Sequence, residues 1–124
     1  MNREEFLKAR KKLGKTQRQL AELLCTSLKA IHSYEQGWRT IPASVERQIL
    51  FLVSTKTGIV KEKIPCWAIK NCTVQYKSQC PAWELQAGEF CWFINGIICE
   101  GIVYKDWKEK IKVCRRCEVF ATLL

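Results

Sequence analysis

The sequence lacks several features that would place it in common classes of protein. Histidine occurs once, at position 32, and the longest apolar run, residues 49–53, is far shorter than a membrane span of about 20 residues. No cleavable apolar segment follows the charged start of the chain, so we expect no signal peptide, no membrane association and a cytoplasmic location. No nucleophile–base pair, phosphate-binding loop or carboxylate arrangement supports catalysis, so we expect no enzymatic activity.

Cysteine, in contrast, is abundant, with eight residues among 124. Cys25 stands alone in the first half of the chain, and the other seven cysteines fall between positions 66 and 117. This change of composition predicts two domains, residues 1–57 and 58–124, with residues 55–58 as the link and Gly58 as a helix stop. Because the cytosol is reducing, so many cysteines indicate metal or redox chemistry rather than structural disulfides.

Positive charge is concentrated in the first predicted domain. Residues 1–57 contain eleven Lys and Arg against five Asp and Glu, whereas residues 58–124 contain ten against seven. Basic side chains can displace the cations condensed on phosphates, so this bias is typical of a protein that binds a polyanion such as nucleic acid. A merely well-solvated surface is the alternative explanation.

Hydrophobic periodicity predicts four short helices in the first half of the chain. The expected helices span residues 4–13, 17–24, 28–36 and 45–53. Thr16 and Ser27 are expected to cap the second and third helices, and Gly14 and Gly37 to end the first and third. Cys25 falls in the tight turn between the second and third helices.

Two short helices joined by a tight turn form a helix-turn-helix. Ala21 stands where a small side chain lets the two helices cross closely, and Ile31 and Tyr34 stand where apolar side chains anchor the second of them. With the string TQRQLAELL from Thr16, residues 3–54 resemble the Cro and lambda-repressor (XRE-type) regulators. The resemblance implies a mainly helical, lambda-repressor-like bundle that binds double-stranded DNA.

The resemblance also implies which residues contact DNA. Gln17 would touch a phosphate, Lys29 would donate to guanine, and Leu28 would meet a thymine methyl group. The remaining contacts are expected on the recognition helix and just after it, at Ser27, His32, Ser33, Arg39 and Thr40. For each residue the alternative is a solvated helix face.

Two departures from the family pattern concern the turn and the dimer contact. The family usually has glycine where this chain has Cys25, so we expect a left-handed residue there at a cost of roughly 1 kcal/mol. No fifth helix is evident before the cysteines begin. An apolar tail, comprising Val119, Phe120, Leu123 and Leu124, either packs on its own domain or forms the seam of a homodimer that reads two half-sites.

A repeated cysteine motif characterises the second half. Residues 66–69 (CWAI) recur as residues 91–94 (CWFI), residues 80–82 (CPA) lie between them, and residues 114–117 (CRRC) close the series. Two thiolates with a two-residue spacer can reach one metal ion. From Cys66 to Phe120 the pattern resembles the small, cysteine-rich two-CW domain of bacterial chemotaxis receptors, sensor kinases and regulators. The resemblance implies a sensory role for a small, irregular domain.

All seven cysteines of this half are candidate metal ligands, with Cys114 and Cys117 foremost. The set is Cys66, Cys72, Cys80, Cys91, Cys99, Cys114 and Cys117. Ligation by sulfur alone fits an iron–sulfur cluster or tetrahedral zinc. We favour the cluster over zinc, and zinc over disulfides or free thiols, since the irregular spacings differ from a tandem zinc knuckle. His32, on the recognition helix, is not expected to take part.

The two halves together predict a sequence-specific transcriptional regulator whose cysteine-rich domain binds a metal or iron–sulfur cluster and senses redox state or metal supply. The alternative is a DNA-binding protein whose cysteine domain holds a purely structural zinc ion or binds a partner. Four tryptophans are expected mainly in the core of the second domain, at positions 67, 83, 92 and 107, where they would supply apolar area.

Overall fold

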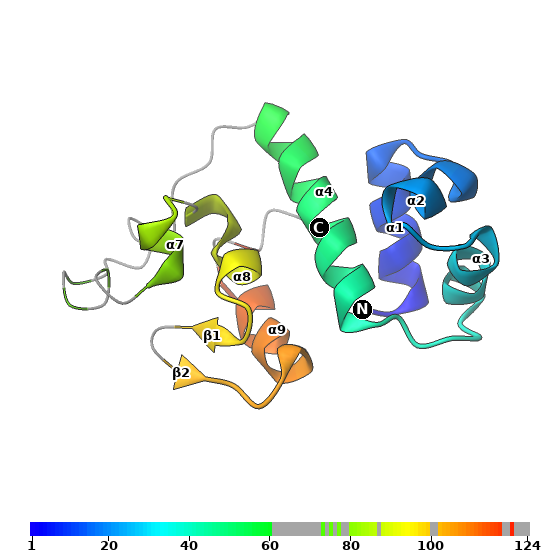
Figure 1. Ribbon diagram of the computed structural model, residues 1–124. Helices are drawn as coiled ribbons and strands as arrows, with labels where there is room; N and C mark the ends of the chain where they lie inside the picture. The colour runs from blue at the N-terminus through cyan, green and yellow to red at the C-terminus, as the bar shows by residue number, and fades with distance from the viewer. Residues whose placement is uncertain are drawn as a thin grey trace. The chain divides into compact units, whose positions relative to one another are not determined.

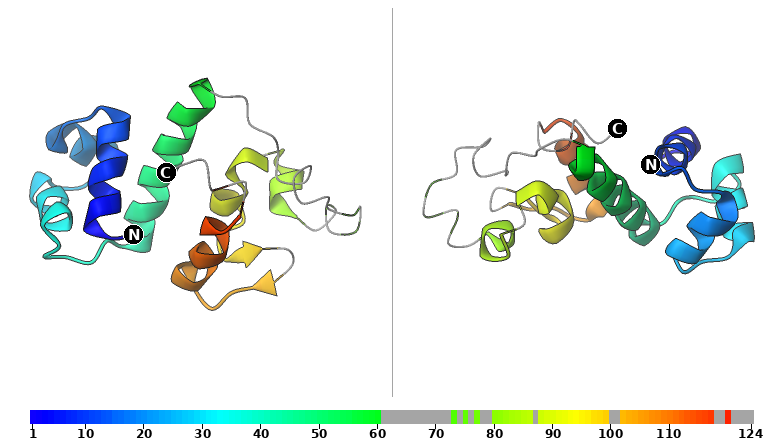
Figure 2. Two further views of the ribbon diagram at one scale, coloured as in Figure 1. Left: turned by 180° about the vertical axis from the view of Figure 1, so that it is seen from behind. Right: turned by 90° about the horizontal axis from the view of Figure 1, so that it is seen from above.

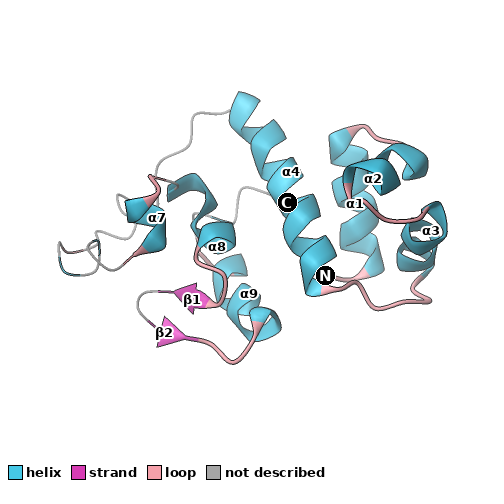
Figure 3. Cartoon of the chain, in the orientation of Figure 1, coloured by secondary structure: helices cyan, strands magenta, loops and turns pink. Residues whose placement is uncertain are grey.

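The computed structural model describes residues 1–60, 73, 75, 77, 80–86, 88–99, 102–117 and 120, with the backbone alone at 57–60 and 89. The contacts between residues divide the chain into two compact units, Met1–Thr57 and Gly58–Leu124. Both units are mainly helical in their described parts (Figure 3). No helix among the described residues is long and apolar enough to cross a membrane.

The first unit is a bundle of short helices around one apolar core. Its helices are α1 (Arg3–Leu13), α2 (Gln17–Leu23), α3 (Leu28–Gln36) and α4 (Ala43–Val60). Figures 1 and 2 show α3 packed beside both α1 and α2, the arrangement of a helix-turn-helix. The core comprises Phe6, Ala9, Leu20, Ala21, Leu24, Ala30, Ile31, Tyr34, Ile41, Val45, Ile49, Leu50 and Val53. The predicted mainly helical fold is confirmed, and the predicted bounds of α1, α2 and α3 agree to within one residue.

Side-chain caps begin the first three helices. The Asn2 side chain accepts a hydrogen bond from the Glu5 amide at 2.8 Å. Thr16 Oγ1 accepts from the Gln19 amide at 3.1 Å while Gln19 Oε1 accepts from the Thr16 amide at 3.0 Å, which completes a capping box. Ser27 Oγ accepts from the Ala30 amide at 3.0 Å. The predicted caps at Thr16 and Ser27 are therefore confirmed, because these hydroxyls satisfy amides that a helix start leaves unpaired.

The same left-handed turn ends α1, α2 and α3. The left-handed residue is Gly14 after α1, Cys25 after α2 and Gly37 after α3, with φ of 67°, 54° and 77°. After α2, the amide of Thr26 donates to the carbonyl of Ala21 at 2.9 Å, the long hydrogen bond of a Schellman motif. The predicted left-handed conformation of Cys25 is confirmed; this residue is exposed in the turn, so it is not part of the core.

Helix α4 is longer than the sequence pattern predicts. We expected a helix over residues 45–53 and a stop at Gly58, whereas α4 continues to Val60. Thr55 lies inside the helix, and its hydroxyl donates to the Phe51 carbonyl at 2.9 Å. A glycine inside a helix costs only about 1 kcal/mol, so Gly58 does not break α4. The predicted helix stop at Gly58 is wrong, and the border between the two units, after Thr57, falls within a helix.

The second unit is built from very short elements. They are α7 (Pro81–Glu84), η1 (Gly88–Phe90), α8 (Cys91–Ile94), β1 (Ile98–Cys99), β2 (Ile102–Val103) and the longer α9 (Trp107–Arg115) (Figure 1). The two strands are antiparallel, with Ile98 opposite Val103 and Cys99 opposite Ile102. The irregular character expected of this domain is confirmed for the residues that the structure describes.

Aromatic side chains form much of the described core of this unit. Trp92 is buried and meets Phe120 edge-on, with ring centroids 5.6 Å apart, and Trp107 is also buried. Trp83 is only half-buried, with the Lys77 ammonium 4.6 Å from its ring centroid. The core positions of Trp92 and Trp107 are therefore confirmed, whereas Trp67 lies outside the described residues.

The buried face of α9 includes a charged residue. Trp107 and Ile111 are buried, whereas Val113 is half-exposed. Lys110 and Cys114 are buried instead, because they lie three and seven residues after Trp107 on one face of the helix. Phe120 packs within its own unit, and the other three residues of the predicted apolar tail lie outside the described part.

Replacing Cys25 with glycine tests the left-handed turn. The substitution Cys25→Gly should raise the free energy of unfolding by about 1 kcal/mol, because glycine adopts positive φ without the steric penalty of a Cβ atom. Chemical denaturation of the reduced protein, followed by far-UV circular dichroism, measures the change.

Two variants control for the thiol and for the turn itself. Cys25→Ser removes the thiol but keeps the Cβ atom, so it should leave stability within about 0.5 kcal/mol of the parent. Gly14→Ala should lower the free energy of unfolding by about 1 kcal/mol, because a Cβ atom is strained at positive φ. A Cβ atom there meets nothing closer than Lys56 Nζ at 3.8 Å, so no clash adds to this cost. A Cys25→Gly protein less stable than the parent would show that the turn carries no strain.

Candidate nucleic-acid interface and cysteine sites

Helix α3 presents a mixed polar and apolar face to solvent. Its inner face buries Ala30, Ile31 and Tyr34, at the three- and four-residue spacing of one helical face. Lys29 and His32, on the outer face, are exposed, and so are Leu28 and the cap residue Ser27. Leu28 is 42% exposed although it is apolar, so the outer face of α3 offers apolar as well as polar contacts.

Ser33 does not lie on this outer face. It is 6% exposed, and its hydroxyl donates to the Lys29 carbonyl at 2.9 Å. The expectation that Ser33 is exposed for contact with DNA is wrong. The physical reason is the helical period, since residue 33 follows Ala30 by three positions and so shares the buried face.

Trp38 extends the exposed face beyond the end of α3, and the sequence reasoning missed it. The side chain is 71% exposed and its indole meets His32 edge-on, with ring centroids 5.4 Å apart. The backbone of Trp38 is held where the turn at Gly37 places it, since its amide donates to the Ser33 carbonyl at 2.9 Å. Arg39 and Thr40 follow, both exposed. The sequence signal that could have revealed Trp38 is its position between the helix stop at Gly37 and Arg39.

We call the exposed residues Leu28, Lys29, His32 and Trp38 the reading face. They come from consecutive turns of α3 and from the residue after its cap, so the position of one helix sets the position of all four. Six of the eight predicted DNA-contacting residues are exposed on α3 or next to its ends, namely Ser27, Leu28, Lys29, His32, Arg39 and Thr40. Contact with DNA by each of them stays a prediction.

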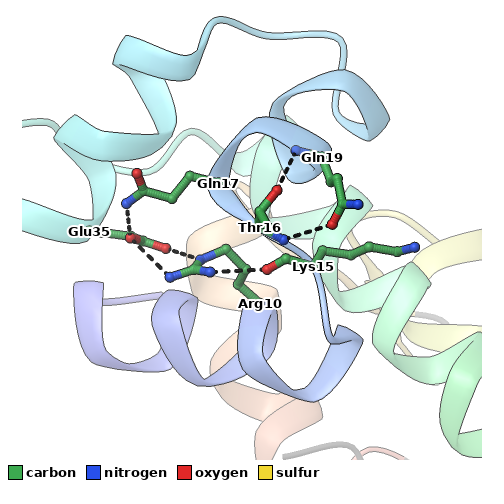
Figure 4. Close-up of polar contacts among 6 residues, drawn as sticks. All are labelled: Arg10, Lys15, Thr16, Gln17, Gln19 and Glu35. Atoms are coloured by element: carbon green, nitrogen blue, oxygen red, sulfur yellow. Dashed lines mark hydrogen bonds and ion pairs between the residues drawn. The ribbon is translucent and has the colours of Figure 1, made fainter.

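The carboxylate of Glu35 links the first three helices (Figure 4). Arg10 of α1 donates to it through both Nε and Nη2, the latter at 3.5 Å, and Gln17 of α2 donates through its side-chain amide. Arg10 Nη1 also donates to the Lys15 carbonyl at 3.0 Å, just before α2. The Glu35 side chain is nearly buried. The network therefore fixes α3 relative to α1 and α2.

This network also determines the orientation of Gln17. The residue is half-buried at the start of α2, where we expected it to touch a phosphate. One of its two side-chain N–H groups donates to Glu35, and a side-chain amide has a second N–H and a carbonyl oxygen for other partners. Phosphate contact by Gln17 stays a prediction, but the side chain is held in one orientation.

The accessible charge of the first unit is strongly positive. Among its Lys and Arg residues, Arg3, Lys8, Lys11, Lys12, Lys15, Arg18, Lys29, Arg39 and Lys56 are exposed. Of its acidic residues, only Glu4 and Glu22 are exposed, while Glu35 and Glu46 have nearly buried side chains. Burial of the acids makes the surface more basic than the sequence composition suggests, which favours a polyanionic partner.

Comparison with protein families agrees with this geometry. Residues 7–45 match the family model described as helix-turn-helix, which covers most of α1, all of α2 and α3, and the start of α4. This match supports a DNA-binding regulator. No curated protein and no solved structure matches the chain. The resemblance of residues 66–120 to a two-CW domain stays a prediction.

The described cysteines of the second unit do not come together in one place. Cys114 is buried, Cys80, Cys91, Cys99 and Cys117 are half-buried, and the predicted ligands Cys66 and Cys72 lie outside the described residues. Within the described ranges, no three Cys, His, Asp or Glu residues form a group that could hold a metal ion.

Two local arrangements favour particular cysteines as ligands. The turn after α9 brings Cys117 back toward Cys114, whose carbonyl accepts from the Cys117 amide at 2.9 Å. At the start of α7, Asn95 Nδ2 lies 3.6 Å from Cys80 Sγ while its Oδ1 accepts from the Ala82 amide at 3.1 Å. Cys80 therefore has an amide donor at its sulfur, and Cys114 and Cys117 are the pair that one turn holds together.

A double-mutant cycle tests the Glu35 network. Glu35→Gln should lower the free energy of unfolding by about 2 kcal/mol, because it leaves the partly buried Arg10 guanidinium without a counter-charge. Arg10→Met should have an effect of similar size, and the double variant should be less destabilised than the sum by about 1 kcal/mol or more. Chemical denaturation of the four proteins gives the cycle.

The control is Glu22→Gln, which removes an exposed carboxylate of α2 and should change stability by no more than about 0.5 kcal/mol. Additive effects of the two substitutions would mean that the Arg10–Glu35 ion pair does not hold the helices together.

Proposed function

We propose that this chain is a sequence-specific transcriptional regulator that places α3 in the major groove of double-stranded DNA. The observation that carries the proposal is the reading face: exposed Leu28, Lys29 and His32 on the third helix of a segment that matches the helix-turn-helix family model. A helix that enters the major groove needs outward side chains able to form hydrogen bonds and apolar contacts with base edges. The reading face has both kinds.

The proposed contacts divide into base recognition and backbone positioning. Lys29 donates to guanine O6 or N7, and Leu28 contacts a thymine methyl group. His32, whose ring meets Trp38 edge-on, is the third residue of this group. Trp38, Arg39 and Thr40 contact the sugar–phosphate backbone at the end of α3, and Gln17 contacts a phosphate at the start of α2. Ser27 has its hydroxyl oxygen engaged with the Ala30 amide, so its hydroxyl hydrogen is the group that reaches a phosphate.

The regulator acts as a homodimer on two half-sites. A single recognition helix covers only a few base pairs, so domains of this size usually bind DNA in pairs with half-sites about one helical turn apart. Residues 1–60 have no described element beyond the four helices of the bundle, and the second unit supplies the dimer contact in this proposal.

The second unit binds a metal centre through thiolates drawn from its seven cysteines, with Cys114 and Cys117 as the foremost ligands. Support comes from the turn that joins Cys114 to Cys117. We favour an iron–sulfur cluster, whose loss or oxidation changes DNA binding through the dimer. A structural zinc ion, insensitive to mild oxidants, is the second candidate, since four thiolates suit tetrahedral zinc equally well.

Selection of preferred duplexes from a random pool tests the DNA-binding function. Lys29→Ala should weaken binding to the selected sequence by about 10- to 100-fold and broaden the preference at one base pair. Arg39→Ala should weaken binding to all sequences similarly and lower the slope of log affinity against log salt by about 1.

The matched control is Lys56→Ala, which removes an exposed positive charge from α4 and should leave the base preference unchanged. If the parent protein selects no sequence over the random pool, the proposed function is wrong.

Metal analysis of protein purified without oxygen tests the role of the cysteines. A cluster of the four-iron type would give about four iron and four sulfide per chain and a visible absorption band that bleaches on reduction. Cys114→Ser should lower the metal content, whereas Cys25→Ser, in the first unit, should not. DNA affinity is then compared for the loaded, metal-free and oxidised proteins.

Equal DNA affinity in the three states would eliminate sensing and leave a structural centre. Zinc without colour would favour the second candidate, and no metal in any preparation would exclude both.

A further inference from the structure

Trp38 is the most exposed of the large apolar side chains that the structure describes. It directly follows Gly37, the left-handed residue that ends α3, and it is 71% exposed. The indole nevertheless contacts the outer face of the helix. Its ring meets the imidazole of His32 edge-on, with centroids 5.4 Å apart and ring planes 79° apart. This is a favourable arrangement for two aromatic rings, so the residue after the helix stop supports a residue of the reading face.

The backbone of Trp38 is held in place on α3 itself. Its amide donates to the Ser33 carbonyl at 2.9 Å, across the turn at Gly37. Ser33 is buried, so this anchor belongs to the packed part of the helix. The position from which the indole extends is therefore set by the turn that ends α3, and the contact with His32 follows from it.

His32 is a residue whose orientation needs such a contact. It is exposed on the outer face of α3, and an exposed side chain can occupy several rotamers. Ordering a side chain when a partner binds costs free energy, and a side chain that is ordered beforehand avoids part of that cost. Contact with the Trp38 ring restricts the imidazole before DNA arrives, while the exposed remainder of the ring stays accessible.

We propose that Trp38 is a positioning residue for His32, and that the imidazole of His32 reads one base pair of the bound DNA. An imidazole N–H can donate to N7, an acceptor that adenine and guanine share in the major groove. The expected preference is therefore a purine at one position of one strand. The inference rests on the proposed DNA-binding function, and it adds a determinant of specificity that lies outside the recognition helix.

This role differs from a contact between Trp38 and the sugar–phosphate backbone. A backbone contact fixes the register of the protein but carries no sequence information. A residue that orients His32 changes which bases are preferred, although it touches no base itself. The two roles therefore predict different results for the same substitutions.

Selection from a random pool of duplexes, with affinities for the selected sequence, provides the first test. His32→Ala identifies the base pair that His32 reads. Trp38→Ala should lose the preference at that same base pair and weaken binding about 3- to 10-fold, because His32 must then be ordered on binding. Trp38→Phe keeps a ring and should retain most of the preference. Trp38→Lys, which offers a phosphate contact without a ring, should recover affinity for all sequences but not the preference.

The matched control is Leu23→Ala, which removes an exposed apolar side chain from α2 and should leave the base preference unchanged. A double variant separates the two roles of Trp38. In the His32→Ala background, Trp38→Ala should cause no further loss of base preference, because residues that act together are not additive. A tryptophan that only contacts the DNA backbone would weaken binding to all sequences alike in both backgrounds.

Proton NMR of the free protein provides the second test. His32 is the only histidine of the chain, so its ring protons give a single set of signals. Trp38→Ala should move these signals, because a neighbouring aromatic ring shifts the resonances of nearby protons, whereas Leu23→Ala should not. Signals that stay in place in Trp38→Ala would show that the two rings do not meet in solution, and the positioning role would be overturned.

The outcomes distinguish this inference from the function on which it rests. If the parent selects a sequence but His32→Ala changes no base preference, or Trp38→Ala keeps the preference that depends on His32, the role of Trp38 is wrong and DNA binding stands. If the parent selects no sequence, the proposed function is wrong and the positioning role is overturned with it, whatever the NMR spectra show.

Discussion

The Glu35 carboxylate is the constraint on which the proposed DNA interface depends. Helices of seven to eleven residues, such as α1, α2 and α3, are not stable alone in water, so contacts between them must set their orientation. Arg10 and Gln17 both converge on Glu35 (Figure 4), and Ile31 and Tyr34 bury the adjacent face of α3. One ion pair thus serves two purposes: it aims α3, and it removes a negative charge from the side that is proposed to meet phosphates.

The sequence predicts those parts of the fold that local chemistry decides. Thr16 and Ser27 cap helices because their hydroxyls bond amides three residues away, and Gly37 ends α3 because its backbone tolerates positive φ. The end of α4 could not be predicted, since Gly58 weakens a helix without stopping it. Ser33 shows the limit of motif transfer: a position assigned to the outer face by resemblance is buried, as its spacing from Ala30 requires.

Residues fixed by contacts distant in sequence were harder to find. Trp38 belongs to no periodic segment, so only its position after Gly37 and its contact with His32 identify it as part of the reading face. Hydrophobic patterning likewise assigns a lysine to the surface. The burial of Lys110 depends on the carbonyl of Trp92, eighteen residues earlier, and no pattern within α9 reveals that partner. The exposed Trp38 and the buried Lys110 both depart from the burial that is usual for their residue types, and such departures often accompany function.

The two units treat charge in opposite ways. The first unit hides Glu35 and exposes its cations, whereas the second unit buries a cation, Lys110, whose ammonium group donates to the Trp92 carbonyl. The residues that orient the reading face, Arg10, Gln17 and Glu35, all lie in the first unit. The proposed homodimer offers a way for the second unit to act without changing those residues. Two linked half-sites bind far more tightly than one, so a change in the spacing or stability of the proposed dimer would alter DNA affinity.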